Sequence, residues 1–166
     1  MKQLWILRHG KAAEKGPGSA DRQRPLAEEG REQSREAGEF LRNRGATLDR
    51  VVCSSALRTK ETAEAVLAAG RYQVPLELTD RVYEAGGSEL LKFLRGLKDS
   101  DSSVLLVGHM PGLGELLSLL VTEQDDPALV FRPGTLALVL VDIDRWAKAG
   151  EGKGALAILL PPRQTG

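Results

Sequence analysis

The stretch Leu4–Gly10 (LWILRHG) joins four apolar side chains directly to an arginine, a histidine and a glycine. Two later stretches have the same form. Val104–Val107 is followed closely by His109. Val51–Cys53 is followed, after a short polar turn, by Arg58. Short runs that are apolar on both faces are typical of strands inside a parallel sheet covered by helices. We therefore expect three parallel strands, each ending close to a polar side chain.

Segments with a helical period separate these strands. Apolar side chains recur every three or four residues over residues 28–44, 59–69, 88–97 and 111–120. Gly45 and Gly70 are predicted to end the first two helices, and Ser88 to cap the start of the third. Pro111 is predicted to lie in the first turn of the fourth. Ala27 precedes the first helix and cannot cap it through its side chain.

The remaining apolar runs complete the expected sheet. A short strand is predicted around Glu77 and Leu78. Thr135–Val141 and Ala155–Leu160 are joined by a polar stretch with several glycines, which favours a hairpin. The alternation of strands and helices predicts an α/β protein with three layers (α/β/α), a mostly parallel sheet and an antiparallel edge. The length corresponds to a single domain over residues 1–166.

The composition excludes several classes of protein. Hydrophobic residues make up 42% and charged residues 28% of the chain, which excludes a disordered protein. With 23 basic and 23 acidic side chains the formal net charge is zero, which argues against a nucleic acid as the main partner. Cys53 is the single cysteine, so an internal disulfide is excluded, and we expect it to be a small buried residue. No apolar run approaches the ~20 residues that cross a bilayer, and Leu4–Leu7 is too short for a signal peptide, so we expect a cytoplasmic protein with no membrane partner.

The polar residues that follow the three strands form one chemical set. In open α/β sheets, ligands bind outside the carboxyl ends of the strands. If the three strands are neighbours, that edge brings together two guanidinium groups and two imidazoles, from Arg8, His9, Arg58 and His109. Such a set suits a tetrahedral anion, most simply a phosphoryl group. A helix starting near Pro111 would add backbone N–H groups to the same site.

Each of these residues also has an ordinary structural explanation. A histidine at the end of a strand is often a hydrogen-bonded structural residue, and a single arginine is often a surface charge. The spacing alone therefore leaves a phosphate site and a set of structural roles both open. A metal site is disfavoured, because the chain has two histidines and no carboxylate or second cysteine at ligand spacing near either. The sequence also lacks the G-x-x-x-x-G-K-[ST] phosphate loop.

Three motifs resemble a known family. Leu7–Gly10 resembles the Arg-His-Gly signature of the histidine phosphatase superfamily, and Ser54–Ala63 resembles its second motif, an arginine before a helix. Gly108–Gly112 is similar to its third motif. The segment Arg24–Leu26, with Gly30 after it, is similar to the one that opens the family's first long helix. The matches come in the family's order, and the short chain resembles the small SixA-type phosphohistidine phosphatases. The resemblance implies a phosphoglycerate-mutase-like fold.

The resemblance also implies roles for the four residues. His9 is the expected nucleophile, which must be neutral to attack phosphorus and form a phosphohistidine intermediate. Arg8 and Arg58 are expected to bind the equatorial phosphoryl oxygens, and a protonated His109 to be the fourth donor. Because cationic side chains would stabilise the charge of the phosphoryl group, no metal ion or other cofactor is expected.

The identity of the general acid depends on the substrate. Glu84 lies between the second and third motifs, where the family often places its acidic residue, but a solvent-exposed turn glutamate is an equally good interpretation. The preferred substrate is phosphohistidine on a protein, such as a phosphotransfer domain of a signalling relay. The alternative is a small phosphomonoester, with Glu84 as the acid. A module that binds phosphate or a phosphoprotein without turnover is a third interpretation, although binding alone does not require a nucleophile.

Other segments depart from the family pattern or border the expected site. Lys11–Ala13 lacks the polar residues that many mutase-like members carry after the signature, and the single asparagine, Asn43, lies on a helix. This weakens a sugar-phosphate mutase interpretation. The long loop Lys11–Arg24 and Met110 are candidates for substrate contact. Residues Glu123–Pro127 are predicted to form a second exposed loop.

Overall fold

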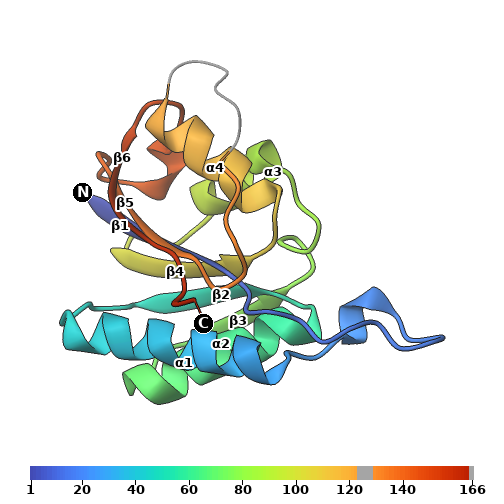
Figure 1. Cartoon of the computed structure of the whole chain (residues 1–166). Helices are drawn as coiled ribbons and strands as arrows, with labels where there is room; N and C mark the ends of the chain where they lie inside the picture. Colours follow the sequence, from blue (N-terminus) through green and yellow to red (C-terminus); the bar gives the residue numbers. More distant parts are fainter. Residues whose placement is uncertain (123–128, 165–166) are drawn as a thin grey trace.

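The computed structural model describes residues 1–122 and 129–164, and the predicted loop at Glu123–Pro127 lies outside them. A six-stranded sheet runs through the centre of the molecule (Figure 1). In chain order the elements are β1 (Lys2–Arg8), a 3-10 turn η1 (Asp21–Gln23), α1 (Glu28–Asn43), β2 (Arg50–Ser54), α2 (Leu57–Gly70), β3 (Leu76–Thr79), α3 (Gly87–Arg95), β4 (Ser103–Gly108), α4 (Gly112–Val121), β5 (Leu136–Val141), a second 3-10 turn η2 (Trp146–Lys148) and β6 (Gly154–Leu160).

The strand order confirms the expected topology. The sheet runs β3-β2-β4-β1-β5-β6, and its first four strands are parallel. The C-terminal hairpin supplies the antiparallel edge, with β5 against β1 and β6 against β5. Because β4 lies between β1 and β2, the three strands predicted from their apolar runs are neighbours. The register pairs Arg8 with Gly108 and Cys53 with Val107, so all three strands end at the same edge.

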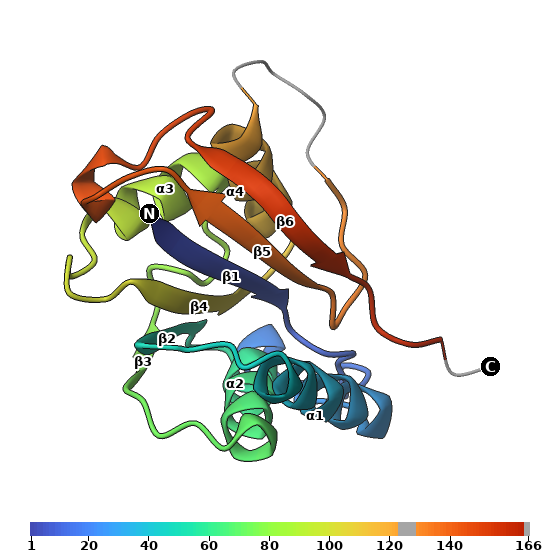
Figure 2. The same cartoon turned by 90° about the vertical axis from the view of Figure 1, so that its left-hand side faces the viewer.

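Helices cover both faces of the sheet, as predicted. Helices α1 and α2 lie on one face, and α3 and α4 lie on the other (Figure 2). Alternate residues of β1 face the two layers. Trp5 and Leu7 pack into the cluster under α1 and α2, whereas Leu4 and Ile6 pack into the cluster under α3 and α4. The runs are apolar on both faces because both faces are buried.

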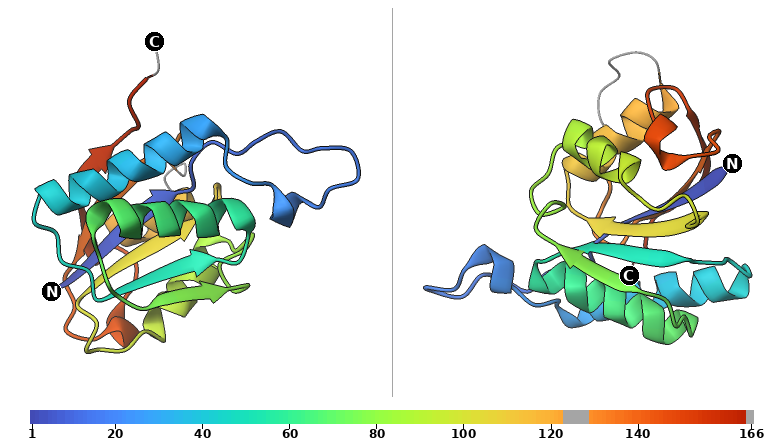
Figure 3. Two further views of the ribbon diagram at one scale, coloured as in Figure 1. Left: turned by 90° about the horizontal axis from the view of Figure 1, so that it is seen from below. Right: turned by 180° about the vertical axis from the view of Figure 1, so that it is seen from behind.

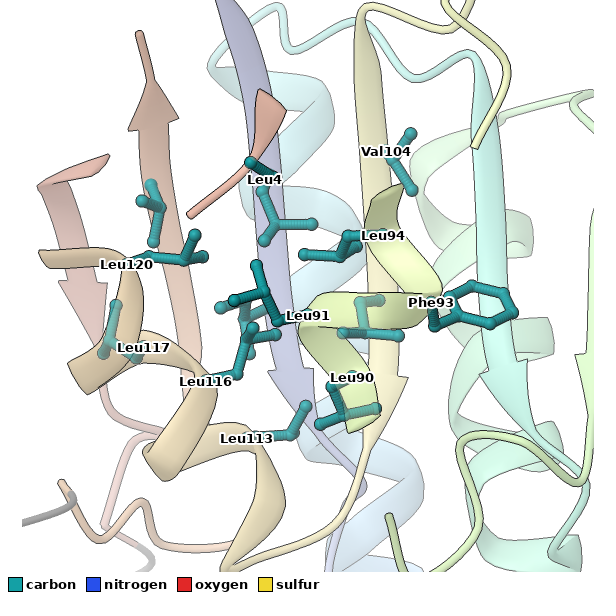
Figure 4. Close-up of a cluster of buried hydrophobic side chains, with 14 of the residues drawn as sticks. Leu4, Leu90, Leu91, Phe93, Leu94, Val104, Leu113, Leu116, Leu117 and Leu120 are labelled. Carbon is teal, nitrogen blue, oxygen red and sulfur yellow. The ribbon is translucent and has the colours of Figure 1, made fainter. Parts of the chain in front are cut away.

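The larger of the two clusters depends on leucines. Figure 4 shows the side chains of α3 and α4 converging on β1 and β4. The leucine stripe of α4 is fully buried, at Leu113, Leu116, Leu117 and Leu120. Burying one such side chain contributes ~1.5–3 kcal/mol to folding. This stripe is therefore core, and it holds the start of α4 against the end of β4.

The local sequence pattern did not predict every helix end correctly. Gly45, with φ 68°, takes the left-handed conformation just after α1, as predicted. The end of α2 differs from the prediction, because Arg71, with φ 58°, takes the left-handed conformation there. Gly70 is required for another reason: a Cβ at this position would lie 2.5 Å from the Tyr72 ring. Helix α2 also begins earlier than predicted, so Arg58 lies in its first turn.

The predicted starts of α3 and α4 were wrong by one residue or two. Gly86, not Ser88, is the N-cap of α3, and Ser88 lies within the helix. The reason is a contact between two helices: Oε2 of Glu115, on α4, accepts a hydrogen bond from the N–H of Gly87 over 2.8 Å and so satisfies one of the backbone donors at the start of α3. Pro111 is the N-cap of α4 and precedes its first turn.

The features expected of two other residues are present. Ala27 is the N-cap of α1 and makes no side-chain capping hydrogen bond. Cys53 is fully buried, and burial raises the pKa of its thiol to about 12, which keeps it protonated. Across the described residues, the helices are too short or too polar to traverse a bilayer.

Candidate active site

The structure brings the four predicted residues together at the carboxyl edge of the sheet. Arg8 ends β1 and His9 follows it, Arg58 lies in the first turn of α2 after β2, and His109 follows β4. All four line one cavity of about 610 Å³, together with Glu84. The ring centroids of His9 and His109 are 5.3 Å apart. Residues as far as 100 positions apart in the chain therefore line one polar cavity.

His9 is held in a form suited to nucleophilic attack. Its side chain is buried, and Nδ1 donates to the carbonyl oxygen of Gly10 over 2.7 Å. This bond places the proton on Nδ1 and leaves the lone pair on Nε2. Burial, together with the charges of Arg58 and Arg8, lowers the pKa of His9 to about 4. The imidazole is therefore neutral at pH 7.

Two glycines explain how the first motif is supported. A Cβ on Gly10 would lie 2.4 Å from the carbonyl oxygen of Gly30, in the first turn of α1. A Cβ on Gly30 would in turn lie 2.2 Å from the carbonyl oxygen of Lys11. The end of β1 and the start of α1 are thus in direct backbone contact, which needs a glycine on each side.

A hydrogen-bond chain joins the first motif to the second. The N–H of Gly10 donates to Oγ1 of Thr62 over 3.1 Å. The same hydroxyl donates to the carbonyl oxygen of Arg58, one turn earlier in α2, over 2.7 Å. The backbone positions that carry His9 and Arg58 are therefore linked through one buried side chain.

The protonation of His109 differs from expectation. Nη2 of Arg58 lies 3.3 Å from Nδ1 of His109, and since a guanidinium only donates, Nδ1 is an acceptor. Nε2 therefore carries the proton and donates to Oγ of Ser54 over 2.7 Å. Burial, together with the nearby His9 and Arg58, lowers the pKa of His109 to about 3. Burial and the neighbouring cations therefore disfavour the imidazolium, whereas the donor role expected of His109 toward a phosphoryl group requires it.

The two arginines have different surroundings. Nη1 of Arg8 donates to the carbonyl oxygen of Phe131, and its Nε is buried without a partner among the described residues. Burial and the charge of Arg58 lower the pKa of Arg8. Arg58 is bound by Asp21, whose side chain and backbone both accept from it. Sequence reasoning missed Asp21, because it lies in the loop without periodicity, 37 positions from Arg58.

Glu84 lies at the rim of the same cavity. It is exposed and has a left-handed backbone, with φ 54°. Its neighbour Tyr83 was also missed: its ring packs edge-on against His109, with centroids 5.5 Å apart. Three residues of the long loop, Lys11, Ala12 and Arg24, line the cavity as well, as does Met110. These candidates for substrate contact therefore line the same cavity as the four predicted residues.

The chain resembles known proteins along most of its length. The profile of the family described as histidine phosphatase superfamily (branch 1) matches residues 4–93. An uncharacterized protein of Mycobacterium tuberculosis is 30% identical over 163 residues, which cover 95% of this chain and 100% of that protein. The phosphohistidine phosphatase SixA of Escherichia coli (strain K12) is 29% identical over 142 residues, which cover 84% of this chain and 86% of that protein.

Solved structures agree with these matches. A candidate phosphohistidine phosphatase SixA from Nakamurella multipartitia is 28% identical and covers 97% of this chain and 96% of its own, with a TM-score of 0.82. The family profile spans more than half of the chain and includes the first two motifs, while the structure adds His109 to the same cavity. This chain therefore belongs to the histidine phosphatase superfamily and has its phosphoglycerate-mutase-like fold.

Proposed function

We propose that this protein removes phosphate from phosphohistidine on a protein, through a covalent phosphohistidine formed on His9. The observation that carries the proposal is the geometry of His9: Nδ1 donates to the carbonyl oxygen of Gly10, so the lone pair of the neutral imidazole is on Nε2. The name of the Escherichia coli relative, which matches over 84% of this chain, supports the choice of phosphohistidine as substrate.

The reaction has two displacements at phosphorus. In the first, Nε2 of His9 forms a bond to phosphorus while the bond from phosphorus to the substrate imidazole breaks, and that ring nitrogen takes a proton from solvent. In the second, a water oxygen bonds to phosphorus, the bond to His9 breaks, and the water's proton passes to solvent. Arg8 and Arg58 would bind the equatorial oxygens, where the transition-state charge is spread. These cations supply the electrostatic stabilisation, so the proposal needs no metal ion.

The second candidate function is hydrolysis of a small phosphomonoester. Glu84 supports it, because this carboxyl lines the catalytic cavity and is the acid that an alkoxide leaving group would need. An α-ribazole phosphatase from Shigella flexneri has the same fold, at 18% identity and a TM-score of 0.70 over 95% of this chain and 96% of its own. We favour phosphohistidine because a protonated imidazole leaves without a buried acid, and Glu84 is exposed.

Phosphate release by the wild type and His9→Ala tests the proposal. The substrates are a phosphohistidine-bearing phosphotransfer domain and a panel of phosphomonoesters. Fast release from the domain alone, lost in His9→Ala and unchanged in Glu84→Gln, supports the proposal. Fast release from one phosphomonoester that Glu84→Gln reduces would establish the second function instead. No release from either substrate, with phosphate still bound, would identify a binding module.

A further inference from the structure

One carboxylate binds the phosphate-binding arginine of α2. Asp21 is the first residue of η1, in the long loop that extends from the carboxyl end of β1 (Figure 3). Its Oδ2 accepts from Nη2 of Arg58 over 3.1 Å, and its backbone oxygen accepts from Nη1 over 2.9 Å. Both terminal nitrogens of a buried guanidinium are thus tied to one loop residue.

The same carboxylate has two further partners at the site. Oη of Tyr83 donates to Oδ2 over 3.0 Å, and Nη1 of Arg24 lies 3.4 Å from Oδ1. Burial alone would raise the pKa of Asp21, but the bonds from Tyr83 and Arg58 outweigh it and lower the pKa, so the group stays ionised at neutral pH. Arg24 and Arg58 both act on His9 through their charge. Asp21 therefore sets a negative charge against two of the cations that surround the catalytic imidazole.

We propose that Asp21 is a positioning residue: it aims Arg58 at the phosphoryl group and offsets part of the site's positive charge, so that bound phosphate is released. The kinetic part of this proposal rests on the phosphatase function proposed above. Uniformly tight binding of substrate, product and transition state does not speed turnover. A carboxylate beside Arg58 repels a bound dianion, while the two hydrogen bonds hold the guanidinium in the geometry that the transition state needs.

A purely structural role predicts a different result. Asp21 lies in a contact between two loops, which Asp80 also stabilises: its Oδ1 accepts from Nη2 of Arg22 over 2.7 Å and from Oγ of Ser55. If Asp21 served only to hold the loops together, its loss would loosen Arg58 and weaken phosphate binding. If Asp21 offsets charge, its loss strengthens phosphate binding while turnover slows.

The test compares Asp21→Asn with Asp80→Asn in the full chain. Asn keeps the size and one acceptor oxygen of Asp but removes the charge. We expect Asp21→Asn to lower the Kd for inorganic phosphate, measured by calorimetry, by ~3–10-fold, since one nearby unit charge is removed. We expect kcat to fall by at least ~10-fold, because Arg58 loses its charged anchor. Asp21→Glu should restore the wild-type Kd, and Asp80→Asn should leave it within ~2-fold, in keeping with the small effect of an exposed ion pair.

Two results would overturn the inference. One is weaker or unchanged phosphate binding in Asp21→Asn. The other is an equal gain in affinity in Asp80→Asn, which would assign the effect to the loop contact and not to Arg58. The phosphate titration needs no turnover, so it decides the inference even if the wild type hydrolyses no phosphohistidine. Absence of turnover in the wild type would count against the proposed function alone.

Discussion

Arg58 donates to Nδ1 of His109 over 3.3 Å, and this contact determines which nitrogen of the imidazole carries the proton. Nδ1 is thus an acceptor, and Nε2 donates to Ser54. A phosphoryl oxygen needs a donor, so His109 can contact a phosphoryl group through Nδ1 only after this nitrogen gains a proton. We therefore expect anion binding to be coupled to proton uptake.

That link is measurable with a dianion that does not itself titrate near neutral pH. The pKa of His109 is about 3, and a bound dianion would stabilise the imidazolium and raise this pKa. Binding of tungstate should take up a fraction of a proton that grows as the pH is lowered toward the raised pKa of His109, which calorimetry in buffers of different ionisation enthalpy detects. The control, His109→Gln, should show no uptake. A binding enthalpy in the wild type that is independent of the buffer would contradict the link.

Replacing His9 by Ala should abolish turnover while phosphate still binds. The reason is that the cations of Arg8 and Arg58 remain, but no atom is left to attack phosphorus. Stopped-flow assays of phosphate release, on the substrate that the wild type hydrolyses faster, measure turnover. Calorimetry measures phosphate binding separately. Retained activity above ~1% of wild type would contradict the nucleophile assignment, because loss of a covalent nucleophile costs orders of magnitude in rate.

Replacing Arg58 by Ala should lower kcat/KM by ~10²-fold or more, since one charge-assisted contact to the transition state is lost. Lys60→Ala is the matched control, since Lys60 is an exposed cation on the same helix, 3.9 Å from Glu64. The control should stay within ~2-fold of wild type, because exposed ion pairs contribute little. An effect below tenfold in Arg58→Ala would remove this residue from the mechanism.

The buried His9 should also make the fold sensitive to acid. Its pKa in the folded protein is about 4, below the ~6.5 of an unfolded chain. Between these values the unfolded state binds the proton and the folded state does not, so stability falls as pH drops from 6.5 to 4. His9→Asn should reduce that fall by ~2 kcal/mol, measured by urea unfolding at pH 7 and pH 4.5. An equal fall in both proteins would show that His9 is not the group that titrates.

Replacing a leucine by alanine should destabilise the protein more when the leucine side chain is more deeply buried. Leu117→Ala, at a fully buried position of α4, should lower the free energy of unfolding by ~2–5 kcal/mol, because it leaves a cavity. Leu159→Ala removes the same atoms on β6, where the side chain is 49% exposed, and should cost less than ~1 kcal/mol. Chemical denaturation of the two variants gives the comparison, and similar losses would contradict the packing described here.

The linear sequence was sufficient to predict the main strands and helices and to identify the four polar residues that follow the strands. Periodicity reports which faces are buried, so β1, β2, β4 and the leucine stripe of α4 could be predicted from it. Arg8, His9, Arg58 and His109 could be placed together, because parallel neighbours end at one edge. Glu84 was placed by motif order, and the structure adds that it lines the same cavity.

Tertiary structure alone determined the hydrogen-bond partners and the charge states of these groups. Glu115 reaches across from α4 to satisfy the start of α3, so the cap lies at Gly86 and not at Ser88. Asp21 reaches Arg58 from a loop without periodicity. A local pattern records the burial of its own residues, but it contains no information on contacts between segments tens of residues apart. The charge state of His109 depends on such contacts and on desolvation, and therefore only the folded arrangement determines it.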